Sequence, residues 1–297
     1  MNKLESILVT GFFRTGSTLL FSALRQCVDL RVYYEPYHPD IVEYVDSCQK
    51  GLPNADRERL GHTVDGDYFE EYRKLNLDEM AAAFNKEDRT VHHPVLNSLS
   101  TKLDLFNYVR YLHECAYKEG KVPVLQANRL NFCFDWFSKH FPSNYNVLIT
   151  RKPSDIFSSL RKLALKDGID LRVDTVGLDY WNVLSIFDSL KARYSKIIEL
   201  EKSYYYKLCF VVEWINRIES SKANLVVPYE LLGNGNTQKA ISHALKVFSN
   251  NVLPVSKYIE EHYVEVAPKS KSEYITSIER LVDKQLSFLK NAYEGEI

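Results

Sequence analysis

Five consecutive residues near the start of the chain combine a positive charge, a glycine and hydroxyl groups, a set that could bind an anion. The segment Arg14-Thr15-Gly16-Ser17-Thr18 follows a short apolar stretch, and the pattern after it predicts a helix from Ser17. Backbone N–H groups converge at a helix N-terminus, where the helix dipole favours negative charge. The candidate anion-binding residues are Arg14, Thr15, Gly16, Ser17, Thr18 and Leu19.

This loop departs from the pattern that binds a nucleoside triphosphate. That pattern, G-x-x-x-x-G-K-[ST], requires a lysine directly after its second glycine. Here Ser17 follows Gly16, and the positive charge comes earlier, at Arg14. The loop is therefore expected to hold an anion other than ATP with Mg²⁺.

A second candidate anion site follows a later strand. Arg151 comes directly after the predicted strand Asn146–Thr150, and Ser159 lies eight residues further on, in a helix expected from Pro153. An arginine fork and a serine hydroxyl can donate to one phosphate. A surface ion pair is the alternative for Arg151. If both sites lie on one sheet edge, where open parallel sheets bind ligands, they could hold two anionic groups of a single ligand.

The two motifs, in this order, resemble those of the PAPS-dependent sulfotransferases (PAPS is 3′-phosphoadenosine 5′-phosphosulfate). That family has a 5′-phosphosulfate loop with a basic residue, a small residue, glycine and Ser/Thr, and a 3′-phosphate site with a strand-ending arginine and a serine eight positions later. The segment Val226–Leu232 is similar to the family's strand followed by Tyr-Glu-Asp-Leu. The resemblance implies a P-loop-like fold, PAPS as donor, adenosine 3′,5′-bisphosphate (PAP) as product, and no metal.

The chain differs from one branch of that family. The cytosolic aryl and steroid sulfotransferases have lysine in the loop and a late Arg-Lys-Gly segment that covers the cofactor. Here the loop has Arg14, and Lys269 and Lys271, which precede the last predicted helix, could act similarly. The Arg-Thr-Gly-Ser form looks more like the bacterial and carbohydrate-type branches.

Sulfuryl transfer, which the resemblance implies, needs in-line oxygens, neutralisation of developing charge and removal of the acceptor's proton. Arg14 would stabilise the leaving 5′-phosphate. Glu35, which follows the second predicted strand and is kept out of helical geometry by Pro36, is the candidate general base. His38 is the alternative base, because an imidazole can act near neutral pH. Arg129, at the end of another strand, could contact the cofactor or an acidic acceptor, or form a structural ion pair.

The elements expected to position these residues alternate between strand and helix. Strands are predicted at Ser6–Thr10, Leu30–Tyr34, Val122–Ala127, Asn146–Thr150 and Asn224–Val227. Helices are predicted at Ser17–Cys27, Leu99–Lys118, Pro153–Leu165, Asp179–Glu199, Tyr204–Ser220, Thr237–Phe248 and Ser272–Ala292. This order predicts an α/β fold with a central parallel sheet of about five strands flanked by helices. The polar region 36–97 is expected to form short helices and loops that cap the acceptor side of a single domain, 1–297.

The composition limits the possible partners and compartments. The 297 residues carry a net charge of −1, which argues against a nucleic-acid-coating protein. Five cysteines without a C-x-x-C pair indicate free thiols in a reducing compartment. With neither a signal peptide nor an apolar run of about 20 residues, the protein is expected to be cytoplasmic and without a membrane span. His92 and His93 are adjacent, which does not suit a metal site on a strand.

Three functions remain open at this point. The first is a sulfotransferase that acts on a hydroxyl or amine of a polar acceptor, such as a carbohydrate or small natural product. The second is a P-loop nucleotide kinase, against which Ser17 in the lysine position counts heavily. The third is a non-catalytic nucleotide-binding module. The acceptor's identity and the oligomeric state do not follow from the sequence.

Overall fold

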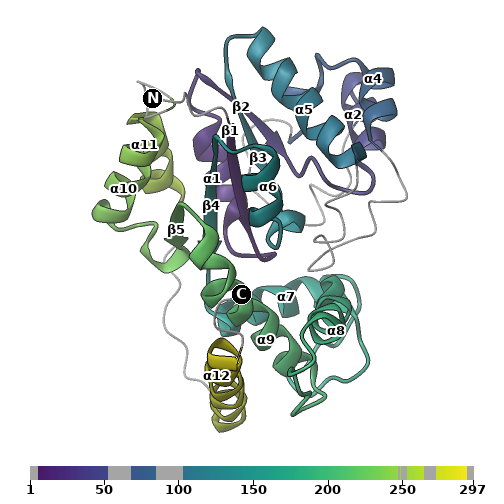
Figure 1. The fold of residues 1–297 in the computed structure, drawn as a ribbon, viewed down its shortest axis with the longest axis vertical. Coiled ribbons are helices and arrows are strands. Elements are labelled where there is room, and N and C mark those ends of the chain that lie inside the picture. The colour runs from purple at the N-terminus through teal and green to yellow at the C-terminus, as the bar shows by residue number, and fades with distance from the viewer. Residues whose placement is uncertain are drawn as a thin grey trace.

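The computed structural model describes residues 6–52, 68–84, 103–246, 248, 253–263 and 272–292, and it is built around a five-stranded sheet (Figure 1). The strands lie in the order β2-β3-β1-β4-β5, and all neighbouring pairs are parallel. Their bounds are Ser6–Gly11 (β1), Leu30–Tyr34 (β2), Val122–Gln126 (β3), Asn144–Thr150 (β4) and Leu225–Pro228 (β5). The predicted parallel α/β sheet is confirmed, with every strand within two residues of its expected bounds.

The inner strands are buried on both faces, as expected for a parallel sheet covered by helices. Every residue of the central strand β1 is buried, and so is every residue of β2, which lies at an edge of the sheet. The polar side chains of β1 are paired: Ser6 Oγ donates to Asn144 Oδ1 at 2.7 Å, and Thr10 Oγ1 donates to the Ala127 carbonyl at 2.8 Å. These bonds tie β1 to β4 and to the segment that follows β3. The carboxyl ends of these strands carry the candidate site residues.

Apart from α1 and α6, which contact β1 and β4, the helices around the sheet lie in three groups (Figure 1). α2, α4 and α5 lie together at one side, α10 and α11 at another, and α7, α8, α9 and α12 beyond one end of the sheet. The bounds are Ser17–Leu24 (α1), Ile41–Gln49 (α2), Leu77–Ala83 (α4), Leu103–Lys118 (α5), Phe134–His140 (α6), Pro153–Lys166 (α7), Val183–Arg193 (α8), Tyr204–Arg217 (α9), Gly235–Leu245 (α10), Leu253–His262 (α11) and Glu273–Ala292 (α12). Short 3₁₀ turns lie at Glu70–Tyr72 (η1), Asn128–Leu130 (η4), Tyr180–Asn182 (η5), Glu219–Lys222 (η6) and Tyr229–Leu231 (η7).

The helices α1 and α9 end three residues before their predicted bounds, and one further predicted helix is shorter at both ends. The sequence predicts a helix over Asp179–Glu199, but α8 covers only Val183–Arg193 and is preceded by the turn η5. Trp181 and Asn182 have left-handed backbone conformations, with φ of 56° and 58°, which a right-handed helix cannot contain. The Asp179 carboxylate accepts the Leu184 N–H at 2.8 Å and so caps the helix start after this break.

The region 36–97 was expected to form short helices and loops. Its described part, residues 36–52 and 68–84, contains α2, η1 and α4, in agreement with that expectation. The remainder lies outside the described residues, as do His92, His93, Lys269 and Lys271.

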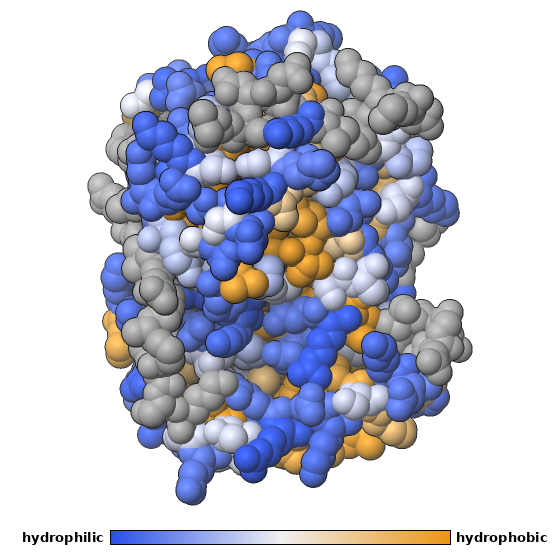
Figure 2. Space-filling view, turned by 90° about the vertical axis from the view of Figure 1, so that its left-hand side faces the viewer, coloured by the Kyte–Doolittle hydropathy of each residue, from blue (hydrophilic) through white to orange (hydrophobic). Residues whose placement is uncertain are grey.

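Three further observations concern the whole chain. All five cysteines are free thiols, as predicted. Among the helices of the described residues, none is long and apolar enough to cross a membrane. On the face shown in Figure 2 the surface is largely hydrophilic, with apolar side chains gathered near its centre and towards its lower edge.

The order of the strands creates a crevice between two neighbouring strand ends. From β1 the chain passes through α1 to β2, towards one edge of the sheet, and from β4 it passes through α7, α8 and α9 to β5 at the other edge. Adjacent strands whose connections leave in opposite directions form a topological switch point, where open α/β sheets bind ligands. β1 and β4 are such a pair, and the two predicted anion motifs follow them.

Candidate active site

The loop after β1 has a shape that depends on two glycines. A Cβ atom on Gly11 would lie 2.5 Å from the Ile149 carbonyl oxygen, so only glycine lets β1 approach β4 this closely. Gly16 has a φ of 91°, and a Cβ there would collide with the ring of Tyr229. Between the glycines, Thr15 Oγ1 donates to the Phe12 carbonyl at 2.7 Å and closes the turn.

The helix α1 begins where the sequence predicted. The amides of Leu19 and Leu20 both donate to the Gly16 carbonyl, at 3.0 and 3.4 Å. The amides of Ser17 and Thr18 precede Leu19, whose amide is the first to donate within the helix, so these two donors are available to an anion at the helix start. Gly16, the N-cap residue, makes no side-chain cap that would compete with such an anion.

Arg14, Arg151 and Ser159 lie together in the crevice between β1 and β4. Arg151 Nη1 donates to the Arg14 carbonyl at 2.8 Å, and Arg14 Nε donates to Ser159 Oγ at 2.9 Å. The expectation that both motifs share one sheet edge is met. The geometry adds a contact that the sequence did not predict, because Ser159 bonds to Arg14, the arginine of the other motif.

Tyr229 joins the two motifs from a third segment. The guanidinium of Arg151 lies 4.2 Å from the centre of the Tyr229 ring, and the same ring packs against Gly16. The Lys152 amide donates to Glu230 Oε1 at 3.0 Å, which ties the end of β4 to the turn after β5. Sequence reasoning identified this segment only through its resemblance to Tyr-Glu-Asp-Leu, and gave Tyr229 no place in the site.

The crevice concentrates positive charge. Burial lowers the pKa of Arg14, the nearby tyrosine Tyr34 opposes this, and the positive charge of Arg151 lowers the pKa further. Arg151 Nε is buried and has no hydrogen-bond partner among the described residues. Two half-buried guanidinium groups that repel each other, one with an unsatisfied donor, are stabilised by an anion between them.

Glu35 lies at the carboxyl end of β2, on the same edge of the sheet. It is 5% exposed, and its carboxylate is held on both oxygens: the Asn128 amide donates to Oε1 at 3.2 Å, and Arg129 Nη1 donates to Oε2 at 3.3 Å. Its φ is 40°, outside right-handed helical geometry as expected before Pro36. Burial raises the pKa of Glu35, and the charge of Arg129 opposes that rise. Of the alternatives for Arg129, the structure has the ion pair.

His38 has local partners in the turn after β2. Its amide donates to the Glu35 carbonyl at 2.9 Å, and its Nδ1 accepts the Asp40 amide at 3.1 Å. The ring packs against that of Tyr44 at 4.8 Å. These contacts hold the imidazole at the start of α2, and its role as the alternative base stays a prediction.

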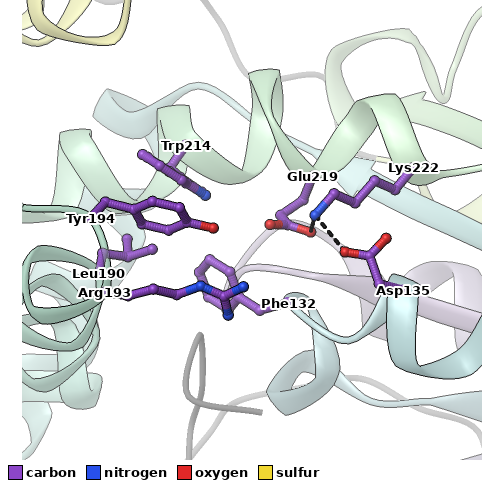
Figure 3. A pocket seen from close by; sticks show the side chains of 8 residues that line it. All are labelled: Phe132, Asp135, Leu190, Arg193, Tyr194, Trp214, Glu219 and Lys222. Atoms are coloured by element: carbon purple, nitrogen blue, oxygen red, sulfur yellow. Dashed lines mark hydrogen bonds and ion pairs between the residues drawn. The ribbon is translucent and has the colours of Figure 1, made fainter. Parts of the chain in front are cut away.

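A small hollow in the described structure is lined by other residues (Figure 3). It has about 230 Å³ of empty space, open solvent included, and is lined by Phe132, Asp135, Leu190, Arg193, Tyr194, Trp214, Glu219 and Lys222. Lys222 Nζ lies 2.8 Å from Asp135 Oδ2 and 3.5 Å from Glu219 Oε2. This amine therefore ties α6 to η6. None of the predicted site residues lines the hollow.

The described residues contain no group of three or more His, Cys, Asp or Glu side chains that could hold a metal ion. The side chains that meet at the strand ends include arginine, serine and tyrosine, with the glutamates Glu35 and Glu230. This set suits an anionic ligand, which guanidinium groups and hydroxyls bind directly.

A parallel five-stranded sheet flanked by helices, with a candidate anion-binding loop after β1 and an arginine after its neighbour β4, defines an α/β protein with its candidate site at the strand ends. A family model described as "Sulfotransferase family" matches residues 6–206. Because this match covers more than half of the chain, the protein belongs to the sulfotransferase family. The resemblance seen in the sequence is confirmed.

A comparison with solved structures found matches to sulfotransferases. A sulfotransferase from Alicyclobacillus acidocaldarius is 10% identical, with 98% of this chain and 96% of that chain covered and a TM-score of 0.41. Sulfotransferase STF1 from Mycobacterium tuberculosis H37Rv is 15% identical, with 95% and 76% covered and a TM-score of 0.44. A comparison with curated proteins found no significant match.

Proposed function

We propose that this protein transfers a sulfuryl group from PAPS to a hydroxyl or amine of a polar acceptor, such as a carbohydrate or small natural product, and that it needs no metal ion. The observation that carries the proposal is the chain of contacts Ser159–Arg14–Arg151 in the crevice between β1 and β4. Family membership supplies the reaction class. The five free thiols are in keeping with action in the reducing cytoplasm.

The donor's two anionic ends match the two cationic motifs. Arg14 and the amides of Ser17 and Thr18 would bind the 5′-phosphosulfate side and neutralise charge on the leaving 5′-phosphate. Arg151 and Ser159 would bind the 3′-phosphate, and the unsatisfied Nε of Arg151 is a donor suited to it. Thr15, Gly16 and Leu19 would shape the loop around the donor.

Glu35 would act as the general base. In the transfer, a bond forms between the acceptor oxygen or nitrogen and sulfur as the bond from sulfur to the 5′-phosphate oxygen breaks, and the acceptor's proton passes to the Glu35 carboxylate. A raised pKa suits this role, because a base works best when its pKa is near the operating pH. Glu35, Arg14 and the turn that contains His38 all lie at the strand ends, so the acceptor would enter from that edge.

Calorimetry with PAP and 5′-AMP tests the donor assignment. Only PAP has a 3′-phosphate, so Arg151→Ala should weaken PAP binding about 10–100-fold, the loss expected for charge-assisted bonds, and barely change 5′-AMP binding. Arg193→Ala is the control, since Arg193 also lies over a tyrosine ring, at 5.3 Å, but outside the site. Equal losses for the two nucleotides would show that Arg151 does not bind the 3′-phosphate.

A further inference from the structure

Arg129 and its neighbour Asn128 hold both oxygens of the Glu35 carboxylate from one short turn, η4. The carboxylate accepts the Asn128 amide on Oε1 at 3.2 Å and Arg129 Nη1 on Oε2 at 3.3 Å. The Glu35 amide donates to the Gln126 carbonyl at 2.7 Å. Because Glu35 directly follows β2 and η4 follows the adjacent strand β3, the pairing of these strands fixes where carboxylate and guanidinium meet.

The Arg129 side chain is itself held in place. Its guanidinium lies 5.7 Å from the centre of the Phe13 ring, and that ring packs against Trp181 at 4.8 Å. The side chain is 12% exposed. Phe13 directly precedes Arg14. Arg129, which pairs with Glu35, therefore packs on the same loop that carries Arg14 of the proposed donor site.

We propose that Arg129 is a positioning residue for Glu35: it keeps the buried carboxylate ionised and aimed, and so ready to accept a proton. The inference deepens the proposed function and rests on it for the role of Glu35. A carboxylate buried this far keeps its charge only with a paired cation and hydrogen bonds. Of the four lone pairs of the carboxylate, η4 uses two and the Gln126 side chain uses one, so one remains for an acceptor's proton.

The other ionisable groups that face Glu35 do not replace Arg129. Tyr34, on the same strand, and Tyr72, from η1, both interact with Glu35, and burial raises the pKa of each phenol, so both are neutral at physiological pH. Arg14 acts on Tyr34 from the loop after β1. Among the charged groups described around Glu35, Arg129 is the one that favours the ionised carboxylate most strongly.

The test is a pH titration of the Glu35 carboxyl carbon by ¹³C NMR in the full chain, with the signal assigned by its loss in Glu35→Gln. Arg129→Met should move the midpoint to higher pH. The acid limb of the rate of ³⁵S release from labelled PAPS should move with it, since each pH unit means about tenfold less ionised base on that limb. Calorimetric affinity for PAP should stay within about twofold, because Arg129 is not assigned to the donor.

A matched control comes from a second buried pair. Arg25 Nε donates to Glu71 Oε1 at 2.5 Å, the two side chains are 12% and 14% exposed, and Arg25 also lies over a phenylalanine ring, at 5.2 Å from Phe21. Arg25→Met removes a similar pair outside the site, so it should leave the Glu35 midpoint and the pH profile unchanged. If Arg129→Met does not fold, Arg129→Gln, which keeps a donor without the charge, should show the same rise.

Two results would overturn the proposal. One is an unchanged Glu35 midpoint in the Arg129 variants; the other is a loss confined to PAP affinity, which would make Arg129 a donor-binding residue. Failure of the proposed function has a different signature. In that case Glu35→Gln would turn over like the unmodified protein, although the NMR midpoint still depended on Arg129.

Discussion

Backbone strain in the described chain gathers around one aromatic side chain. The non-glycine residues with positive φ are Arg14, Glu35, Trp181 and Asn182. Phe13 precedes the first of these, its ring contacts Trp181, and Arg129 connects it to Glu35. Each such conformation costs on the order of 1–3 kcal/mol and persists only where surrounding structure enforces it, most often at functional sites. The strain is therefore independent support for placing the chemistry at these strand ends.

Glu35 should also link stability to pH. Burial raises its pKa on folding, so the folded state binds this proton more tightly than the unfolded chain does. The stability this gives is present below the unfolded pKa, about 4.3, and is lost as pH rises through the folded pKa. Glutamine does not titrate, so the Glu35→Gln variant does not lose this stability as the pH rises. The variant should therefore gain stability relative to the unmodified protein as pH rises from about 4.3 through the folded pKa of Glu35, while turnover falls about 10²–10⁴-fold.

Urea unfolding of both proteins across that pH range measures the effect. The comparison cancels the contributions of other buried carboxyl groups, such as Glu71 and Glu219, whose pKa values burial also raises. A stability difference that stays constant with pH would contradict the assignment of a raised pKa to Glu35.

At the scale of elements, the loop between β1 and α1 depends on the turn after β5. Gly16→Ala places a methyl group into the ring of Tyr229, at a φ of 91° that costs a non-glycine residue about 1–2 kcal/mol. Gly51→Ala is the control that separates the cost of the left-handed backbone from the cost of the collision. Gly51 also has a positive φ, 71°, but nothing lies within 4 Å of the place its Cβ would take. Gly16→Ala should lose more stability than Gly51→Ala and should also bind PAP more weakly, because the displaced ring supports Arg151.

The double variant Gly16→Ala/Tyr229→Ala completes this experiment. Removing the ring relieves the collision, so the double variant should cost less stability than the two single changes added together. Thermal unfolding and PAP calorimetry provide both readouts. Additive losses would mean that the loop and the ring do not meet in the way described.

The elements also show what a sequence can predict. Strands such as β1 and β4 were predictable from short, apolar, β-branched runs. These runs alternate with segments of helical periodicity, a pattern that has few other interpretations. The helix α6 was missed because its seven residues are too few for a periodic signal. The break before α8 was missed because Trp181 carries no turn signature, and a single asparagine, although Asn182 tolerates the left-handed conformation, is a weak signal inside a helical pattern.

The candidate site was predictable only as separate motifs. The loop 14–18 and the pair Arg151 and Ser159 are local patterns, and topology brings such patterns to one edge. Which atoms meet depends on how helices turn and strands pair. The bonds from Arg14 to Ser159 and from Arg129 to Glu35, and the stacking of Tyr229, are contacts of that kind.

For the whole molecule, the net charge of −1 means that its cations attract an anion locally rather than by a general field. The surface in Figure 2 is largely hydrophilic. Over the whole chain, 38 basic and 39 acidic residues nearly balance, so neither sign of charge dominates. Under the proposed function, ligand selectivity comes from the crevice between β1 and β4, where Arg14 and Arg151 lie in contact.

Ligand-induced thermal stabilisation of the full chain tests this selectivity. A ligand that binds only the folded state at a hundred times its Kd adds about 2.7 kcal/mol, which for a chain of this size raises Tm by about 5 °C. PAP should give such a shift, 5′-AMP a smaller one because it lacks the 3′-phosphate, and NAD none. EDTA should change neither the PAP shift nor sulfuryl transfer, since the proposed chemistry uses arginine in place of a metal ion. A larger shift with ATP, dependent on added Mg²⁺, would instead indicate a nucleotide kinase, and would mean that Ser17 in the lysine position does not prevent triphosphate binding.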